Sequence, residues 1–398
     1  MKFIIQKGDL KLISITKLLC DSKNYGDNLR YVEGASSEKF GVSPGKGPVI
    51  SWNCTKTCNL RCKHCYASSD NKKYNDELTL SDSKKFIDDL KNFNVPALLF
   101  SGGEPLMKED ILDILNYADI KNIRSTLSTN GTLLDKDICR FLKKINLGYV
   151  GVSLDGIGTS HDEFRGVKGA FDSSLIGIRN CMEVNQKVGL RFTITKNNYK
   201  DLKDIFYLIK EEHIPRVCFY HLAYSGRGSK MTTEDISKEE TREALDLIIN
   251  KAIEFGPNVE ILTVDNHADA VYTYLKSLEK FKDKSENILK LLKINGGNRS
   301  GMAFANVDFY GNVHPDQFTW QYTFGNVKKE NFSSIWKNSN HQILKGLRNR
   351  KTLLKGKCST CKWLNVCNGN FRTRAEAVYN DFWAEDPACY LTDEEIKL

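Results

Sequence analysis

The sequence predicts an α/β fold in which six parallel strands and the helices between them curve into a partial, TIM-like (β/α)6 barrel. Short apolar segments alternate with amphipathic helical patterns from about residue 48 to residue 223. Glycine-rich or polar turns directly follow several of these apolar segments. Because the carboxyl ends of parallel strands meet at one face of a barrel, we expect the polar residues of those turns to lie together there.

The six expected strands are short, apolar and bounded by turn residues. They are residues 48–53, 97–101, 124–128, 148–154, 188–194 and 217–222. Apolar side chains at three- and four-residue spacing predict helices between them, as at Phe86, Leu90 and Phe93. Thr79 and Asp135 stand just before two such patterns, where a hydroxyl or carboxylate group can cap a helix.

The residue pattern changes at three points along the chain, which predicts four structural regions. Residues 1–47 form an N-terminal leader, and residues 48–231 form the barrel. We expect a helical bridge over residues 232–295. In residues 296–398, glycine-rich turns and short strands lead into a group of cysteines, which predicts a second domain.

The composition is that of a globular protein. Of 398 residues, 40% are hydrophobic and 27% are charged. No apolar run reaches the roughly 18 residues that span a bilayer, and no signal peptide is recognisable, so we expect a cytoplasmic protein without membrane contact. The net charge of +8 is spread along the chain without a nucleic-acid-binding motif. A basic protein of this kind would attract a substrate that bears several carboxylates.

Three cysteines directly after the first expected strand are the strongest chemical signal. Cys58, Cys62 and Cys65 have the spacing C-x3-C-x2-C, and Tyr66 follows them. Twelve cysteines in a cytoplasmic chain favour metal or redox chemistry over disulfides. Three thiolates can hold three irons of a [4Fe–4S] cluster and leave the fourth iron open to a ligand. Zinc, with His64 as its fourth ligand, is the alternative.

Polar groups stand at the ends of the next four expected strands. The second strand ends in the turn Gly102-Gly103-Glu104-Pro105, where paired glycines let the backbone approach a ligand closely. The other candidates at or just beyond strand ends are Ser128, Asn130, Ser153, Asp155, Arg165 and Thr193.

In this order, the cysteine loop and the four strand ends resemble the radical S-adenosylmethionine (SAM) enzymes. The resemblance implies that the open iron binds SAM and that Gly102 to Pro105 bind its methionyl amine, with the Glu104 carboxylate facing the ammonium group. It also implies that the side chains at the later strand ends reach the ribose and carboxylate of SAM.

Four further cysteines lie near the C-terminus, at Cys358, Cys361, Cys367 and Cys389. Four thiolates form a closed set, suited to a fully ligated cluster or to a structural zinc ion. The pattern resembles the SPASM domain of radical SAM enzymes, which usually carries two auxiliary clusters. Phe371 and the segment 311–316 stand where the second set would have cysteines. We therefore expect one auxiliary [4Fe–4S] cluster and two clusters in total.

Longer segments are similar to the radical SAM enzymes that trim side chains from sirohaem-derived tetrapyrroles, a group that includes a didecarboxysirohaem deacetylase. These segments are residues 15–18, 27–31, 220–228, 312–318, 374–377 and 383–390. The resemblance implies that SAM is reductively cleaved to a 5′-deoxyadenosyl radical. This radical removes hydrogen from a side chain that then loses acetate or propionate, in haem or d-type haem biosynthesis. It also implies a reducing partner such as flavodoxin or ferredoxin.

Three residues are candidates for catalysis. His221 and His314 can donate a proton, bind a carboxylate of the tetrapyrrole or ligate its iron, although a structural role is equally open for each. Arg227 can clamp a carboxylate through its two-pronged guanidinium group.

Two other functions remain open. A radical SAM maturase that forms thioether or carbon–carbon links in a ribosomal peptide is the enzymatic alternative. The leader here is shorter than the peptide-binding domain that many such maturases carry. A non-catalytic iron–sulfur electron carrier is the second alternative, but it would leave the Gly-Gly-Glu-Pro turn and the open iron unused.

Overall fold

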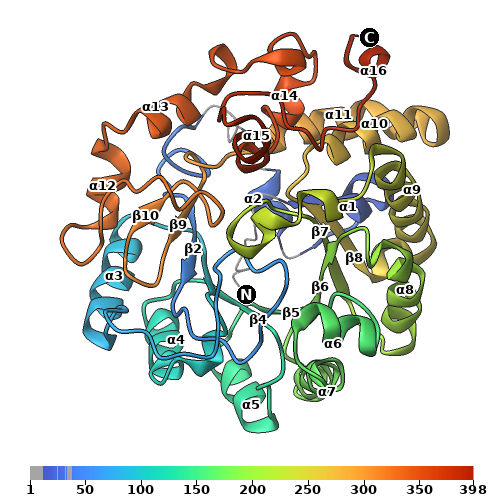
Figure 1. Cartoon of the computed structure of the whole chain (residues 1–398). Coiled ribbons are helices and arrows are strands. Elements are labelled where there is room, and N and C mark those ends of the chain that lie inside the picture. The colour runs from blue at the N-terminus through green and yellow to red at the C-terminus, as the bar shows by residue number, and fades with distance from the viewer. Residues whose placement is uncertain (1–11, 25, 32, 34–37, 398) are drawn as a thin grey trace, which may run out of the picture.

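One twisted sheet runs through the centre of the protein, and helices surround it (Figure 1). The structure is a computed structural model that describes residues 12–24, 26–31, 33 and 38–397. The strand order is β1-β8-β7-β6-β5-β4-β3-β2-β9-β10. The neighbours from β8 through β2 to β9 are parallel, whereas β1 and β10 at the two edges are antiparallel.

The strands of this sheet are short. They are β1 Leu12–Ser14, β2 Val49–Asn53, β3 Leu98–Ser101, β4 Ser125–Thr129, β5 Tyr149–Ser153, β6 Val188–Ile194, β7 Arg216–His221, β8 Glu260–Val264, β9 Phe304–Val307 and β10 Val313–His314.

The helices that follow the barrel strands lie outside the sheet, and those of the C-terminal part lie along one end of it (Figure 1). The α-helices are α1 Ile15–Cys20, α2 Asp27–Arg30, α3 Leu80–Asn92, α4 Ile111–Ile120, α5 Lys136–Lys144, α6 Thr159–Arg165, α7 Ala170–Glu183, α8 Leu202–Glu211, α9 Lys238–Phe255, α10 Ala268–Lys280, α11 Lys282–Asn295, α12 Phe332–Asn338, α13 Gln342–Arg348, α14 Leu364–Cys367, α15 Arg372–Tyr379 and α16 Asp393–Lys397. The 3-10 helices are η2 Pro105–Met107, η3 Tyr199–Asp201, η4 Gly226–Lys230, η5 Thr232–Glu234, η6 Gly256–Asn258, η7 Arg350–Thr352 and η8 Gly356–Ser359.

The six predicted strands correspond to β2 to β7, and both predicted caps are confirmed. The Thr79 hydroxyl accepts a hydrogen bond from Asp82 N at the start of α3, and Asp135 accepts one from Ile138 N at the start of α5. Apolar residues on these strands are buried because helices cover the sheet, as expected for parallel strands. The predicted partial barrel is therefore the central part of the fold.

The sheet is larger than the sequence predicts. The expected helical bridge over 232–295 also contains β8, which pairs in parallel with β7. The region from residue 296 contributes β9, which pairs in parallel with β2. The barrel and the cysteine-rich C-terminal region therefore share one hydrogen-bonded sheet.

The described part of the leader is fixed to the β8 edge. Strand β1 pairs with β8 through Leu12 to Ser14. In α2, the Arg30 guanidinium lies 2.8 Å from a carboxylate oxygen of Glu260 at the start of β8, and Arg216 of β7 lies 3.3 Å from the other oxygen. This buried cluster of two arginines and one glutamate ties the leader to the barrel. No helix in the described part of the chain is both long and apolar enough to cross a membrane.

Candidate active site

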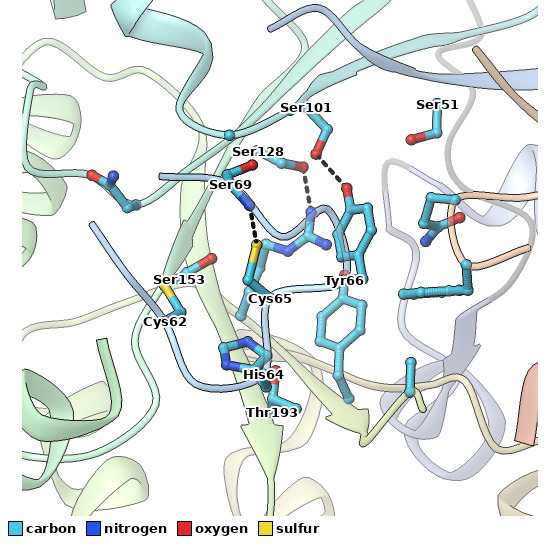
Figure 2. Close-up of a pocket in the computed structure, with 18 of the residues that line it drawn as sticks. Ser51, Cys62, His64, Cys65, Tyr66, Ser69, Ser101, Ser128, Ser153 and Thr193 are labelled. Carbon is cyan, nitrogen blue, oxygen red and sulfur yellow. Dashed lines mark hydrogen bonds between the residues drawn. The ribbon is translucent and has the colours of Figure 1, made fainter. Parts of the chain in front are cut away.

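A large cavity opens at the carboxyl ends of the parallel strands. It contains about 1380 Å³ of space, counting its solvent-open mouth. Cys58, Cys62 and Cys65 line it together with residues from the ends of β3 to β8. Figure 2 shows Cys62, Cys65 and Tyr66 facing Ser128 and Ser153 across this space. The structure thus brings the predicted cysteine loop and the predicted strand ends to one site.

Each thiol of the cysteine loop accepts a hydrogen bond from a neighbouring N–H group. The donors are Leu60 N to Cys58 Sγ at 3.4 Å, Arg165 to Cys62 Sγ at 3.4 Å and Ser69 N to Cys65 Sγ at 3.5 Å. Such donors stabilise cluster thiolates and tune a cluster's reduction potential. Burial raises the pKa of the Cys58 thiol to about 12, so binding of iron must displace its proton. The loop therefore fits a cluster held by three thiolates.

The 3-10 helix η4 clamps the cysteine loop from the side of β7. Arg227 donates from Nε to Cys62 O at 2.8 Å and from a terminal nitrogen to Ser69 O at 2.7 Å. The backbone N–H of Arg227 donates to Cys65 O at 2.9 Å. Gly226 has φ 56°, and a Cβ atom there would lie 2.2 Å from Tyr66 O. Arg227 lines the cavity as predicted, but its guanidinium is engaged in holding the loop.

The Gly102-Gly103 turn packs directly against the strand-to-cysteine connection. Gly103 N donates to Thr55 O at 2.7 Å. A Cβ atom on Gly102 would lie 2.5 Å from Thr55 O, and one on Gly103 would lie 2.2 Å from Thr57 O. Only glycine allows this approach, so the pair positions the cysteine loop and also leaves backbone open to the cavity.

The structure places eight of the predicted SAM-binding residues on the cavity wall. They are Tyr66, Gly102, Gly103, Ser128, Asn130, Ser153, Arg165 and Thr193.

Glu104, Pro105 and Asp155 differ from the prediction because they lie behind the cavity wall. The Glu104 carboxylate is fully buried and accepts hydrogen bonds from Thr129 Oγ1 at 2.7 Å, Asn130 N at 2.8 Å and Leu106 N at 3.1 Å. Burial raises its pKa. With three of its acceptor positions occupied, this carboxylate braces the ends of β3 and β4, and it is not among the residues that line the cavity.

Asp155 holds another wall residue in place. Its carboxylate forms an ion pair with Arg165 and accepts a hydrogen bond from Thr193 N at 2.5 Å. Burial acts to raise the pKa of Asp155, but the charge of Arg165 and smaller contributions, among them the hydrogen bond from Thr193 N, together outweigh this effect and hold the pKa below its ordinary value. Asp155 therefore positions Arg165 beside Cys62.

The two candidate catalytic histidines differ in position. His221 ends β7 and lines the cavity, whereas His314 in β10 is buried away from it. The ring nitrogens of His314 lie 3.0 Å from Tyr322 O and 3.3 Å from a carboxylate oxygen of Asp308. His314 therefore supports the turn after β9, and the prediction that it contacts substrate is not met in this structure.

Sequence reasoning missed two groups on the cavity wall. Arg191 on β6 donates to the Ser128 hydroxyl group, and its guanidinium carbon lies 4.7 Å above the ring centroid of Tyr220. Phe318 packs on Tyr66, with 5.2 Å between ring centroids. A charged residue at the centre of the apolar segment 188–194 was the available signal for Arg191. Phe318 reaches the cavity from a distant part of the chain, and its only signal was its place in the segment 312–318, which resembles the tetrapyrrole-trimming enzymes.

The four C-terminal cysteines converge on a second, small cavity. Cys358, Cys361, Cys367 and Cys389 line it with apolar neighbours that include Leu364 and Leu391. Among the described residues, no three histidine, cysteine or acidic side chains are arranged to hold a single metal ion. Four thiols around one small cavity form a closed ligand set, which suits a fully ligated iron–sulfur cluster or a zinc ion.

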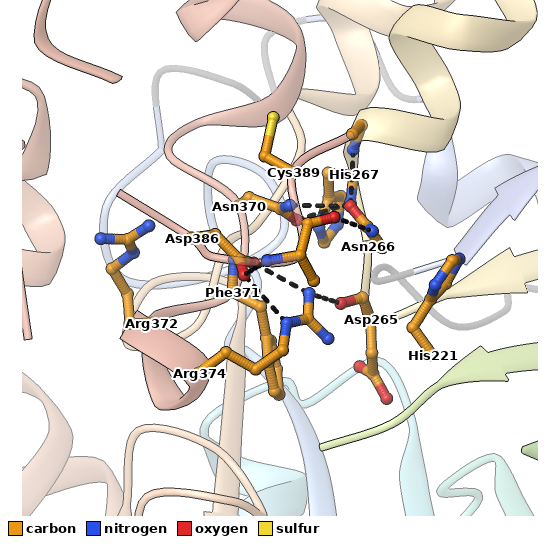
Figure 3. Close-up of polar contacts among 12 residues, drawn as sticks. His221, Asp265, Asn266, His267, Asn370, Phe371, Arg372, Arg374, Asp386 and Cys389 are labelled. Carbon is orange, nitrogen blue, oxygen red and sulfur yellow. Dashed lines mark hydrogen bonds and ion pairs between the residues drawn. The ribbon is translucent and has the colours of Figure 1, made fainter. Parts of the chain in front are cut away.

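The segment between β8 and α10 links the two cavities (Figure 3). Asp265 lines the large cavity, and its carbonyl oxygen accepts a hydrogen bond of 2.6 Å from Arg374. Arg374 also forms a buried ion pair of 2.8 Å with Asp386. Asn266 donates to Ala388 O, next to Cys389, at 3.0 Å. Buried polar contacts thus connect the wall of the cavity to the C-terminal cysteines.

Known proteins match the whole chain and its two cysteine regions. Residues 52–209 match the radical SAM superfamily, and residues 300–362 match the iron–sulfur cluster-binding domain SPASM. Fe-coproporphyrin III synthase of Methanosarcina barkeri is 50% identical over 97% of this chain and 99% of its own length. Pre-heme d1 synthase of Dinoroseobacter shibae is 42% identical over 87% of each chain.

Two further known proteins are more distant in sequence. A mycofactocin maturase of Mycolicibacterium smegmatis is 26% identical over 80% of this chain and 76% of its own. The crystal structure of Streptococcus suis SuiB bound to SAM has a TM-score of 0.69 at 18% identity, over 87% of this chain and 78% of that chain. This likeness shows a common fold. Enzymes of the radical SAM superfamily use a [4Fe–4S] cluster with SAM, and a SPASM domain adds an auxiliary iron–sulfur cluster. The chain belongs to this superfamily and, within it, to the SPASM group that includes Fe-coproporphyrin III synthase and pre-heme d1 synthase.

Proposed function

We propose that this enzyme removes acetate or propionate side chains from a sirohaem-derived tetrapyrrole, giving an iron coproporphyrin or a precursor of d-type haem. The identities of 50% and 42% to the two tetrapyrrole enzymes support this substrate class. The site itself supports it through one observation: a single cavity joins the three-thiol loop to a wall of cationic and aromatic side chains.

The side chains of that wall are suited to bind a flat macrocycle that carries carboxylates. Tyr220 and Phe318 offer ring faces or edges to a planar ligand. Arg191 and His221 lie on the same wall and can pair with carboxylates. Arg191 already touches the Tyr220 ring, so stacking and charge recognition are available at one place.

The residues of the chain bind the cluster and SAM and position them for the reaction. With the cluster bound at Cys58, Cys62 and Cys65, SAM supplies the hydrogen-abstracting chemistry. The Gly102-Gly103 backbone and the polar groups at the ends of β4 and β5 would hold SAM against it. The enclosing strands and the clamped loop keep water from the reacting groups.

His221 is the proposed group that exchanges a proton with the substrate. Its Nε2 atom lies 2.9 Å from Oδ2 of Asp269, which leaves Nδ1 for a ligand in the cavity. An aspartate partner fixes the tautomer of the imidazole and stabilises its protonated form. Nδ1 would then bind a carboxylate of the tetrapyrrole or exchange a proton with it.

Maturation of a ribosomal peptide is the second candidate function. The resemblance to a mycofactocin maturase supports it at 26% identity, which is about half the identity to the Fe-coproporphyrin III synthase. We therefore favour the tetrapyrrole.

For the reducing partner we propose a flavodoxin or ferredoxin, and for the location the cytoplasm. All twelve cysteines are free thiols, which is consistent with a reducing compartment.

The test offers substrates to anaerobically reconstituted enzyme with SAM and a chemical reductant. With a sirohaem-derived tetrapyrrole, we expect the substrate mass to fall by whole acetate or propionate groups, at a rate that depends on SAM. Modification of a peptide encoded beside this gene, with the tetrapyrrole left unchanged, would overturn the proposal in favour of the maturase.

A further inference from the structure

A second large cavity lies apart from the active-site cavity and is strongly basic. It is bounded by the end of α11, by α13, by η7 and by α14, and contains about 1320 Å³ of space, counting its open mouth. Six basic side chains line it: Lys39, Lys293, Arg299, Arg348, Arg350 and Lys351. No aspartate or glutamate is among the described residues that line it, and it shares no lining residue with the active-site cavity.

The three arginines form the buried floor of this basic cavity. Arg299 and Arg350 are each 2% exposed and Arg348 is 8% exposed. Their hydrogen bonds go to neutral oxygen atoms, such as Arg299 to Gly41 O at 3.0 Å, Arg348 to Trp336 O at 2.6 Å and Arg350 to Ser300 O at 2.6 Å. Three positive charges are thus buried side by side with carbonyl and amide partners.

Two other buried arginines of this protein pair directly with carboxylates. Arg30 pairs with Glu260 at 2.8 Å, and Arg374 pairs with Asp386 at 2.8 Å. At the basic cavity, burial instead lowers the pKa of Arg299 and Arg348 to about 10 and that of Arg350 to about 9. The charges of Glu38 near Arg299 and of Asp316 near Arg350 offset the effect of burial only in part. A buried cation without a directly paired carboxylate is costly, so the floor gains stability from an anion.

Arg299 also has a hydrogen-bond donor without a partner. Its Nε is buried and makes no hydrogen bond within the described structure, although its terminal nitrogens bond to Glu38 O, Gly41 O and Val42 O. A buried donor of this kind normally has an acceptor.

The rim of the basic cavity is cationic as well. Lys351 Nζ donates to the amide oxygen of Asn365 at 2.6 Å, and Lys39 Nζ donates to that of Asn349 at 2.5 Å. Lys293 is exposed at the end of α11. Amide partners hold two of these lysines in place without neutralising them.

We propose that this cavity is a binding site for a small oxyanion with two or more negative charges, such as a compound with phosphate or carboxylate groups. The buried arginine floor supplies charge and directional donors, and the lysine rim supplies attraction at the mouth. Leu364 lines both this cavity and the cavity of the C-terminal cysteines, so a bound anion lies one helix away from the auxiliary cluster.

The experiment is calorimetric titration of the anaerobically reconstituted full-length enzyme with inorganic pyrophosphate and, separately, with citrate. We expect one saturable site per chain, weakened by added potassium chloride because the attraction is electrostatic. The anion that binds more tightly identifies the ligand class as phosphate or carboxylate.

Two double variants locate the site. Lys293→Gln with Lys351→Gln removes two rim charges and should weaken binding about tenfold, since each is a charge-assisted contact. Lys290→Gln with Lys345→Gln removes the same charge from exposed positions on α11 and α13 that do not line the cavity, and should leave the affinity unchanged. Arg299→Lys should weaken binding at the floor.

Two results overturn the proposal. One is that neither pyrophosphate nor citrate shows saturable binding. This holds also if an acidic protein binds this face, because the proposed ligand is a small anion. The other is an equal loss of affinity in the two double variants, which would show a general effect of net charge.

Discussion

The Nε2 atom of His221 lies 2.9 Å from Oδ2 of Asp269, and Oδ1 of the same carboxylate accepts a 2.8 Å hydrogen bond from the Tyr390 hydroxyl group. His221 lines the active-site cavity, and Tyr390 directly follows Cys389, which lines the cavity of the C-terminal cysteines. All three side chains are almost completely buried. One carboxylate thus orients the cavity histidine and joins it to the C-terminal cysteine region.

Asp269→Asn should impair substrate turnover selectively. An amide cannot stabilise the imidazolium form of His221 as a carboxylate does, so we expect tetrapyrrole conversion to fall about 10- to 100-fold, in the range found for residues that orient a functional histidine. Cleavage of SAM without substrate should be unchanged. Asp246→Asn is the matched control, because Asp246 also accepts a bond from a tyrosine, Tyr272, but lies outside the cavity. Equal losses in the two variants would contradict the assignment of His221.

Gly103→Ala should weaken SAM binding at least about tenfold. The new Cβ would lie 2.2 Å from Thr57 O, so the connection that carries the cysteine loop must move. Equilibrium dialysis of SAM with the reconstituted enzyme measures this. In the control Gly256→Ala, the Cβ meets nothing within 4 Å, although φ is 59°. The control should lose about 1–3 kcal/mol of stability through backbone strain and keep its affinity for SAM.

Glu260→Gln should destabilise the fold and flatten its dependence on pH. Burial acts to raise the pKa of Glu260, but Arg216 and Arg30 outweigh it and hold the pKa below its ordinary value. The contribution of the Glu260 carboxylate to the free energy of unfolding is therefore fully present above its pKa in the unfolded chain, about 4.3. This contribution is lost as the pH falls through its lower pKa in the folded protein.

Urea unfolding at pH 7 and near pH 4 checks this prediction. Arg216 would then lack its carboxylate and Arg30 would keep only Asp27, which should cost about 3–5 kcal/mol at pH 7. Glu254→Gln is the control, since its pair with Lys251 is largely exposed, and should cost less than about 1 kcal/mol. A Glu260 variant as stable as the control would show that the cluster does not hold the leader to the barrel.

The central strands could be predicted because their signals are local. Apolar segments flanked by turns gave β2 to β7, and the caps at Thr79 and Asp135 gave two helix starts. Strand β8 was hidden because its five residues begin with a glutamate and stand between two long helices. Strand β9 pairs with β2 across about 250 residues of sequence, and no local pattern reports such a pairing.

The candidate active site likewise contains residues with a local sequence signal and residues whose placement no local signal reports. Spacing and order along the chain identified the cysteines and the strand-end turns that line the cavity. The sequence could not show which side of a turn each side chain faces, so Glu104 and Asp155 were expected in the cavity although they brace it from behind. His314 lies in the edge strand β10 and does not line the cavity, because the long-range pairing that places β10 has no local signal in the sequence.

The most direct test of the central claim examines the iron that the three-cysteine loop leaves open. Reduced, reconstituted enzyme is mixed with SAM that carries isotopic labels on the amine and carboxylate of its methionyl group, and electron–nuclear double resonance is recorded. We expect hyperfine couplings from both labelled positions in the wild type and none in Cys62→Ala. A wild-type spectrum without these couplings, from enzyme whose clusters are fully loaded, would contradict the account.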